Sequence, residues 1–224
     1  MLKNCPMKSR KYVYVGIVAA AIALAIVIII QFNVIPKVQD NSTPSNQVAF
    51  LDFSYDEANS DIRSTLAPYS INMTHPIRLS SQSDVHQYCN FLTDSKKQAL
   101  VTYCTSAVLK DKEGFLGDVN MVGTPDLPGL VVVALQSNPM MSNYGDVKTV
   151  FSAVVNNTIC KCWEKEAPSG FSTLSSLVDK LRDTHLTTKD PTTSTPVMPL
   201  GNKHFKIELT TNESGYLWKL LVSK

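Results

Sequence analysis

The sequence KHFKIELTTNESGYLWKLLV, residues 203–222, is the stretch that decides the fold. Its first half alternates apolar and polar residues, which is the pattern of a strand with one buried face. The apolar members of this half are Phe205, Ile207 and Leu209. Turn-forming residues occupy 212–215, and residues 216–222 are again rich in apolar and aromatic side chains. The stretch therefore predicts an antiparallel hairpin.

Upstream of the hairpin, strand and helix patterns alternate without a βαβ repeat. The stretch LVVVAL (130–135) is apolar at every position, which predicts a strand buried on both faces. Other expected strands are 49–53, 106–110 and 115–122, with loops at 124–129 and 184–199. Expected helices are 55–66, one capped by Ser83, one capped by Asp94 that runs to Cys104, 146–163, and one capped by Ser172. This mixture predicts an α+β fold.

Composition and charge exclude several classes of protein. The chain has 224 residues, a formal net charge of +2, 44% hydrophobic residues and 18% charged residues. This composition is too apolar for a disordered chain and contains too many polar and charged residues for a polytopic membrane protein. Residues 1–11 hold four basic side chains and no acid, which leaves 17 basic against 19 acidic residues in the rest. No basic balance remains there for a nucleic-acid partner.

The N-terminal part contains a long apolar segment. Residues 12–30, YVYVGIVAAAIALAIVIII, would span about 28 Å as a helix, close to the thickness of a bilayer core. We expect a single-pass transmembrane helix within 12–35, a cytoplasmic basic leader at 1–11, and an extracytoplasmic C-terminal part. The lipid bilayer is therefore an expected partner. A cleaved signal peptide is the alternative, but the apolar run exceeds a typical signal-peptide core.

Two further regions follow the apolar segment. Residues 36–47, PKVQDNSTPSNQ, are polar and contain two prolines, which predicts a flexible stalk. Residues 48–224 are long enough to bury a substantial core and are expected to form one extracytoplasmic α+β domain.

Four cysteines lie in the expected extracytoplasmic part, where disulfides persist: Cys89, Cys104, Cys160 and Cys162. Cys160 and Cys162 are two residues apart at an expected helix end, so their side chains should diverge. In a helical hairpin about Thr93, Cys89 and Cys104 would be offset by about 10 Å. We therefore expect Cys89 and Cys104 each to bond to one member of the other pair, in undetermined order.

Two other interpretations of these cysteines compete with structural disulfides. Four thiolates could bind zinc, although the spacing lacks the paired knuckles of strong zinc motifs. Alternatively, Cys160 and Cys162 could form a redox or Cu(I) pair, with Lys161 lowering a thiol pKa and His86, Met140 or Met141 as further ligands.

Four short stretches resemble uncharacterised archaeal membrane-anchored exported proteins. They are QYCNF (87–91), GTPDLPG (123–129), CKCWE (160–164) and ELTTNESGYLW (208–218). The resemblance covers most of the C-terminal part and implies an exported location and a four-cysteine pattern. It implies no activity.

The sequence nominates no catalytic centre. It contains no HExxH pair, no G-x-S-x-G elbow, no P-loop and no G-x-G-x-x-G. We therefore expect no cofactor and a binding or structural role at the outer membrane face, toward a protein or small-ligand partner. The alternative is a thiol-redox or copper-handling protein that uses Cys160 and Cys162.

Overall fold

The computed structural model describes residues 49–92 and 94–224. The described chain is an α+β fold, as the sequence predicts. The expected leader (1–11), transmembrane helix (12–35) and stalk (36–47) lie outside the described residues. Within the described ranges, no helix has both the length and the apolar character required to span a bilayer.

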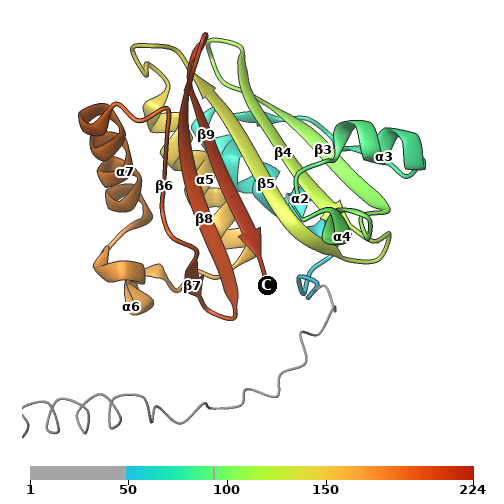
Figure 1. Cartoon of the computed structure of the whole chain (residues 1–224). Coiled ribbons are helices and arrows are strands. Elements are labelled where there is room, and N and C mark those ends of the chain that lie inside the picture. Colours follow the sequence, from blue (N-terminus) through green and yellow to red (C-terminus); the bar gives the residue numbers. More distant parts are fainter. Residues whose placement is uncertain (1–48, 93) are drawn as a thin grey trace, which may run out of the picture. The chain divides into compact units, whose positions relative to one another are not determined.

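One antiparallel sheet is the centre of the fold (Figure 1). Its strand order is β1-β3-β4-β5-β9-β8-β6, with β2 paired to β3 and β7 paired to β8. The strands are β1 (Asn72–Met73), β2 (Ile77–Leu79), β3 (Tyr103–Lys110), β4 (Phe115–Gly123), β5 (Pro128–Ser137), β6 (Thr192–Ser194), β7 (Met198–Leu200), β8 (Lys203–Asn212) and β9 (Gly215–Ser223).

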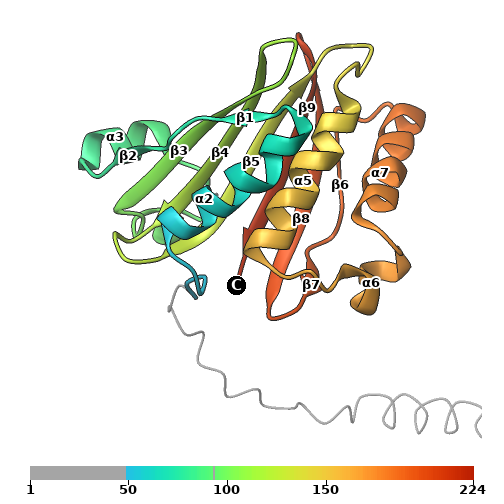
Figure 2. The same cartoon turned by 180° about the vertical axis from the view of Figure 1, so that it is seen from behind.

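The longer helices cover one face of this sheet, as Figure 2 shows from behind. The helices are α2 (Tyr55–Leu66), α3 (Gln82–Tyr88), α4 (Ser95–Gln98), α5 (Tyr144–Thr158), α6 (Trp163–Glu166) and α7 (Leu174–Thr188). Short 3-10 turns follow α2 (Ala67–Tyr69) and α6 (Pro168–Gly170). Helices α2 and α5 bury their apolar sides against the sheet, and α7 lies beside β6 and β8. The opposite face is covered by α3 and α4 at one end, and no other helix of residues 49–92 and 94–224 lies on it (Figure 1).

The predicted C-terminal hairpin is confirmed. Strands β8 and β9 pair in the register Phe205↔Val222 through Asn212↔Gly215. The alternating apolar side chains of β8 are buried under the helices. Gly215 has φ +123°, and a Cβ there would lie 2.4 Å from the carbonyl oxygen of Ser137. Glycine is therefore required for β9 to start so close to the end of β5.

Strand β5 is buried on both faces, as its continuous apolar sequence predicts. Val131, Val133 and Leu135 point toward α2 and α5, whereas Leu130 and Val132 contact the smaller cluster beneath α3 and α4. The strand pairs with β4 on one side and with β9 on the other. Apolar side chains are needed at successive positions only where helices cover both faces, which in β5 is the stretch 130–133; Ala134 and Gln136, farther along, are partly exposed.

The first predicted helix is confirmed with its bounds, and two predicted caps are displaced. Ser54 accepts a hydrogen bond from the backbone N–H of Glu57 and caps α2. The N-cap of α3 is Ser81 rather than Ser83, and the N-cap of α7 is Thr173 rather than Ser172. In each case the cap is the residue whose hydroxyl reaches the N–H three positions later.

Four expected elements differ in the structure. Helix α4 ends at Gln98 because the chain turns into the sheet, where the N–H of Thr102 donates to the carbonyl oxygen of Gly123. Residues 49–53 are not a strand. Residues 184–199 are not one loop, since they hold the end of α7 and the edge strands β6 and β7. Short edge strands of this kind carry little sequence signal. The helix expected at 146–163 is Tyr144–Thr158, which ends before the cysteine pair.

A buried histidine joins α7 to the sheet edge. The ring nitrogens of His185 lie 2.9 Å from Thr193 Oγ1 and 2.8 Å from Thr211 Oγ1. Burial lowers the pKa of His185 below its ordinary value, and the carboxylate of Asp190 offsets part of this effect. The folded state therefore favours the neutral ring.

The free energy of unfolding should decrease as the pH falls from 7.5 to 5.0, because unfolded His185 takes up a proton near its ordinary pKa of about 6.5. His185→Gln should reduce this slope, and His204→Gln, at an exposed position on β8, should not. Denaturant unfolding at the two pH values measures both slopes. Equal slopes in His185→Gln and the unaltered chain would contradict the assignment.

Candidate functional site

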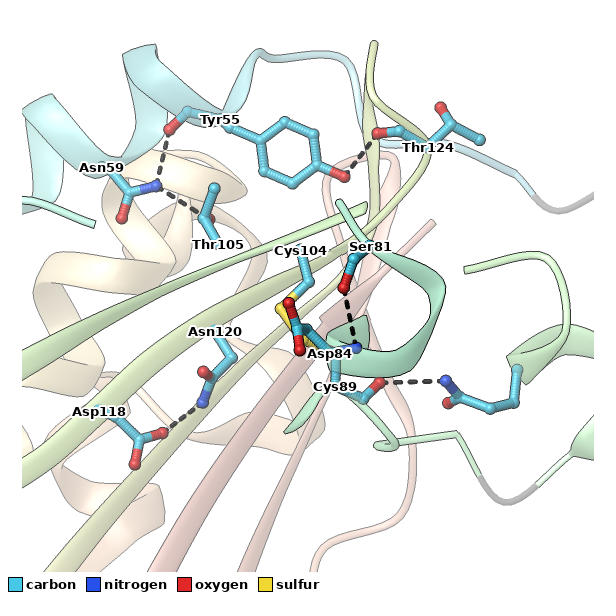
Figure 3. Close-up of a disulfide and its surroundings, with 11 residues drawn as sticks. Tyr55, Asn59, Ser81, Asp84, Cys89, Cys104, Thr105, Asp118, Asn120 and Thr124 are labelled. Carbon is cyan, nitrogen blue, oxygen red and sulfur yellow. Dashed lines mark hydrogen bonds between the residues drawn. A yellow bond between two sulfur atoms is a disulfide. The ribbon is translucent and has the colours of Figure 1, made fainter. Parts of the chain in front are cut away.

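A buried disulfide joins Cys89 to Cys104 (Figure 3). Cys89 is the C-cap of α3 and Cys104 lies in β3, with their Cα atoms 6.4 Å apart and neither residue exposed. The predicted connectivity between the two cysteine pairs is wrong. It rested on a helical hairpin, but Cys104 lies on a strand that passes directly beneath α3.

This disulfide holds the α3–α4 segment against the sheet. Around it lie the apolar side chains of the smaller cluster, Val85, Val122, Leu130 and Val132. The side chain of Gln98 adds a polar connection, since its amide donates to the carbonyl oxygen of Cys89 at 3.1 Å and its oxygen accepts from the N–H of Leu92 at 3.0 Å. The bridge is therefore a structural one, shielded from solvent reagents.

The other two cysteines form a disulfide with each other. Cys160 and Cys162 form a disulfide with Cα atoms 5.2 Å apart, and both residues are partly exposed. The prediction that these two side chains diverge is wrong, because α5 ends at Thr158 and the pair lies in the turn before α6. Helical backbone would have turned the second side chain away, whereas this turn brings both sulfurs to one side.

A carboxylate lies beside this pair. One oxygen of Glu166 and the two sulfur atoms all lie within 4.8 Å of one another. Glu166 is four residues after Cys162, at the last position of α6, so one helical turn places both side chains on the same face. The N–H of Gly201 donates to Oε2 of Glu166 at 2.7 Å and holds the carboxylate in place.

The other ligands proposed for the pair lie elsewhere. His86 is on α3, beside β3 at one edge of the sheet, whereas α6 lies beside β7 at the other edge (Figure 1). Met140 is 87% exposed in the loop after β5, and Met141 packs against the main core. Among residues 49–92 and 94–224, the grouping of potential metal ligands that converges is Cys160, Cys162 and Glu166.

Sequence reasoning missed Glu166. The available signal was the i, i+4 spacing from Cys162, which is informative once a helix is known to begin there. The contribution of Gly201 had no sequence signal, because the turn between β7 and β8 reaches the site through tertiary structure.

A surface depression adjoins the cysteine pair. It has a volume of about 450 Å³ and is lined by α5, α6 and the segment before α7, including Lys161, Trp163, Glu164 and Thr173. Trp163 is anchored there by its indole N–H, which donates to the carbonyl oxygen of Phe171 at 2.9 Å. A partly polar hollow thus includes Lys161, the residue between the two partly exposed cysteines.

A second polar site lies on the open face of the sheet. The amide of Asn120 donates to the carboxylate of Asp118 two residues before it on β4 (Figure 3). Burial raises the pKa of Asp118, and the hydrogen bond from Asn120 opposes this shift. No salt bridge to Asp118 occurs among the described residues. One half-buried acid on a solvated sheet face is common and does not define a reaction.

The chain was compared with protein families, curated proteins and solved structures. No protein-family model, no curated protein and no solved structure matches the chain.

The two disulfides should differ in their effect on stability. Replacing both Cys89 and Cys104 with alanine should lower the free energy of unfolding by about 3 kcal/mol, because the bridge closes a loop of 15 residues. Replacing both Cys160 and Cys162 should cost about half as much, since that loop has a sequence separation of two. Denaturant unfolding under non-reducing conditions compares the variants, and the reverse order would refute this distinction.

Proposed function

We propose that this chain is a membrane-anchored extracytoplasmic protein that exchanges disulfides through Cys160 and Cys162. The observation that supports this proposal is the contrast between its two disulfides. Cys89–Cys104 is buried and joins separate elements, whereas Cys160–Cys162 is partly exposed and closes a very short loop. Accessible disulfides that contribute little to stability are the ones suited to exchange.

The chemistry of such exchange is simple. The thiolate of a partner attacks one sulfur of the pair, and a mixed disulfide forms as the Cys160–Cys162 bond breaks. The released thiolate takes up a proton or attacks the mixed disulfide in turn. Complete reduction transfers two electrons and two protons from an external dithiol, which leaves as its own disulfide.

The surroundings of the pair are compatible with this chemistry. The adjacent depression offers a docking place for the segment that carries the partner's thiol. Lys161 is exposed between the two cysteines, and a nearby positive charge stabilises a thiolate. Opening the pair would leave the sheet intact, because its sulfurs join no distant elements.

The membrane location in this proposal is argued from the N-terminal sequence. The uncharged apolar residues 12–30 and the basic residues that precede them support an N-terminal anchor with the described domain outside the membrane. An oxidising exterior is where a disulfide pair can cycle with small thiols or with protein thiols.

Intact cells treated with a charged, membrane-impermeant phosphine and then an impermeant maleimide should carry two labels on the peptide with Cys160 and Cys162. Cys89 and Cys104 should stay unlabelled because they are buried, and Cys5 because it is expected inside the cell. Mass spectrometry locates the labels. Labelling of the pair in broken cells alone would refute the location, and no labelling in either preparation would refute the exchange function.

Binding of an apolar ligand is a second candidate function, favoured by a separate cavity. This cavity has a volume of about 290 Å³ and lies beneath α4, where the described chain begins at Ala49. Phe50, Leu92, Val101 and Leu130 line it. Because the expected anchor and a short stalk precede Ala49, the lipid acyl chain is the occupant that this proposal assigns to the cavity.

A photoactivatable fatty acid in nanodiscs that carry the full chain should cross-link to residues lining this cavity. Val101→Trp should abolish the cross-link by filling the space, and Val197→Trp, at an exposed position before β7, is the matched control. Peptide mass spectrometry identifies the cross-links. Equal labelling of both variants would eliminate the acyl-chain assignment.

A further inference from the structure

The reduced form of the cysteine pair has the components of a metal site. The two sulfur atoms, joined here as a disulfide, and one carboxylate oxygen lie within 4.8 Å of one another, so one ion could be shared by all three once the S–S bond is opened. The three side chains come from one short segment, the turn before α6 and α6 itself. The ligands are therefore placed by local backbone and do not depend on a large movement.

Contacts with a second segment fix the carboxylate. The N–H of Gly201 donates to Oε2 of Glu166 at 2.7 Å, which leaves Oε1 free of this bond. Gly201 has φ +59°, and a Cβ at this position would lie 3.5 Å from Sγ of Cys160. The turn between β7 and β8 thus binds the carboxylate and passes close to a sulfur of the pair. Hydrogen bonds of this kind orient metal ligands and are a regular part of metal sites.

We propose that reduced Cys160, reduced Cys162 and Glu166 bind one zinc ion. This inference rests on the proposed function, because the disulfide must first be opened by an external dithiol. That step supplies two electrons and two protons and yields two thiols and the oxidised reductant. Binding of Zn²⁺ then releases the two thiol protons, and each thiolate donates an electron pair to the ion.

The donor set selects the class of metal. Calcium and magnesium prefer all-oxygen ligands, so a site with two thiolates does not suit either ion. Copper(I) favours soft sulfur ligands and gains little from a carboxylate. Zinc accepts thiolate and carboxylate ligands together in tetrahedral sites. Three protein ligands leave the fourth position of the ion for water or a ligand from solution.

Zinc binding and disulfide exchange at one pair exclude each other. A bound ion prevents both thiolates from attacking the disulfide of a partner. Oxidation of the pair to a disulfide in turn releases the ion. The site would therefore bind zinc when the pair is reduced and release it when the pair is oxidised, so that zinc occupancy depends on the redox state of the exterior. Glu166 has a role in this scheme that it lacks in disulfide exchange alone.

The test uses the full chain in detergent, reduced with a phosphine under anaerobic conditions and titrated with Zn²⁺ against a chromophoric chelator. The reduced chain should bind one equivalent, and the oxidised chain should bind none at this site. Glu166→Gln should weaken binding about tenfold or more, by analogy with the loss of other groups at zinc sites. Glu213→Gln is the control, since that exposed acid lies in the turn between β8 and β9, outside the ligand group, and should bind as the unaltered chain does.

Titration with Co²⁺ gives a spectroscopic check, because thiolate-to-cobalt charge-transfer absorption reports the number of sulfur ligands. The expected spectrum is that of two thiolates, and it should vanish in Cys160→Ser with Cys162→Ser. Equal affinity in Glu166→Gln and Glu213→Gln would overturn the role of Glu166. Two titratable thiols without zinc binding would overturn the metal site and leave disulfide exchange intact, whereas a pair that resists reduction would overturn both.

Discussion

The pairing of β5 with β9 is the constraint on which the rest of the fold depends. It runs over eight residue pairs, from Leu130↔Ser223 to Ser137↔Tyr216. On one side of this ladder lies the meander β3–β4–β5, and on the other lies the hairpin β8–β9. Helices α5, α6 and α7 intervene in the sequence, so the ladder closes a long loop and must form against its entropy. Without it, α5 would have no continuous sheet on which to bury its apolar side.

Residues on both sides of this ladder show why it forms in one register. Trp218 and Leu220 of β9 lie beside Leu135 and Val133 of β5 and are completely buried under the helices. A slip of one residue would turn these side chains to the open face and bring Lys219 into the core. Gly215 contributes at the end of the ladder, where a side chain would collide with the end of β5.

The sequence predicted those parts of the fold that depend on local periodicity. The alternation from Phe205 to Leu209, the apolar run 130–135 within β5 and the helix at 55–66 all appear where the pattern placed them. Edge strands β6 and β7 were missed because three residues carry too little pattern to separate a strand from a loop. The end of α4 was misplaced because tertiary pairing of Thr102 outweighs the helical spacing before it.

Cysteine connectivity was the part least accessible from sequence, because it depends on distances that only the folded chain defines. Cys104 was expected on a helix and lies on β3, which reverses the geometry on which the expected pairing depended. The same error concealed the candidate site, because a continuous helix through residue 163 would have separated Cys160 from Cys162. Correct placement of one helix end therefore determines whether these sulfurs are predicted as cross-links to a distant element or as a local disulfide.

The described domain begins and finishes at one place. Ala49 and Lys224 line the same small cavity, and Leu51 donates its N–H to the carbonyl oxygen of Pro128 at the start of β5. A few added residues could connect these two points, and new ends could be opened in the turn between β3 and β4, where Lys112 and Glu113 are exposed. The domain is thus suited to circular permutation, because the strand order of its sheet can be kept when the polypeptide of the domain starts at β4 and not at α2.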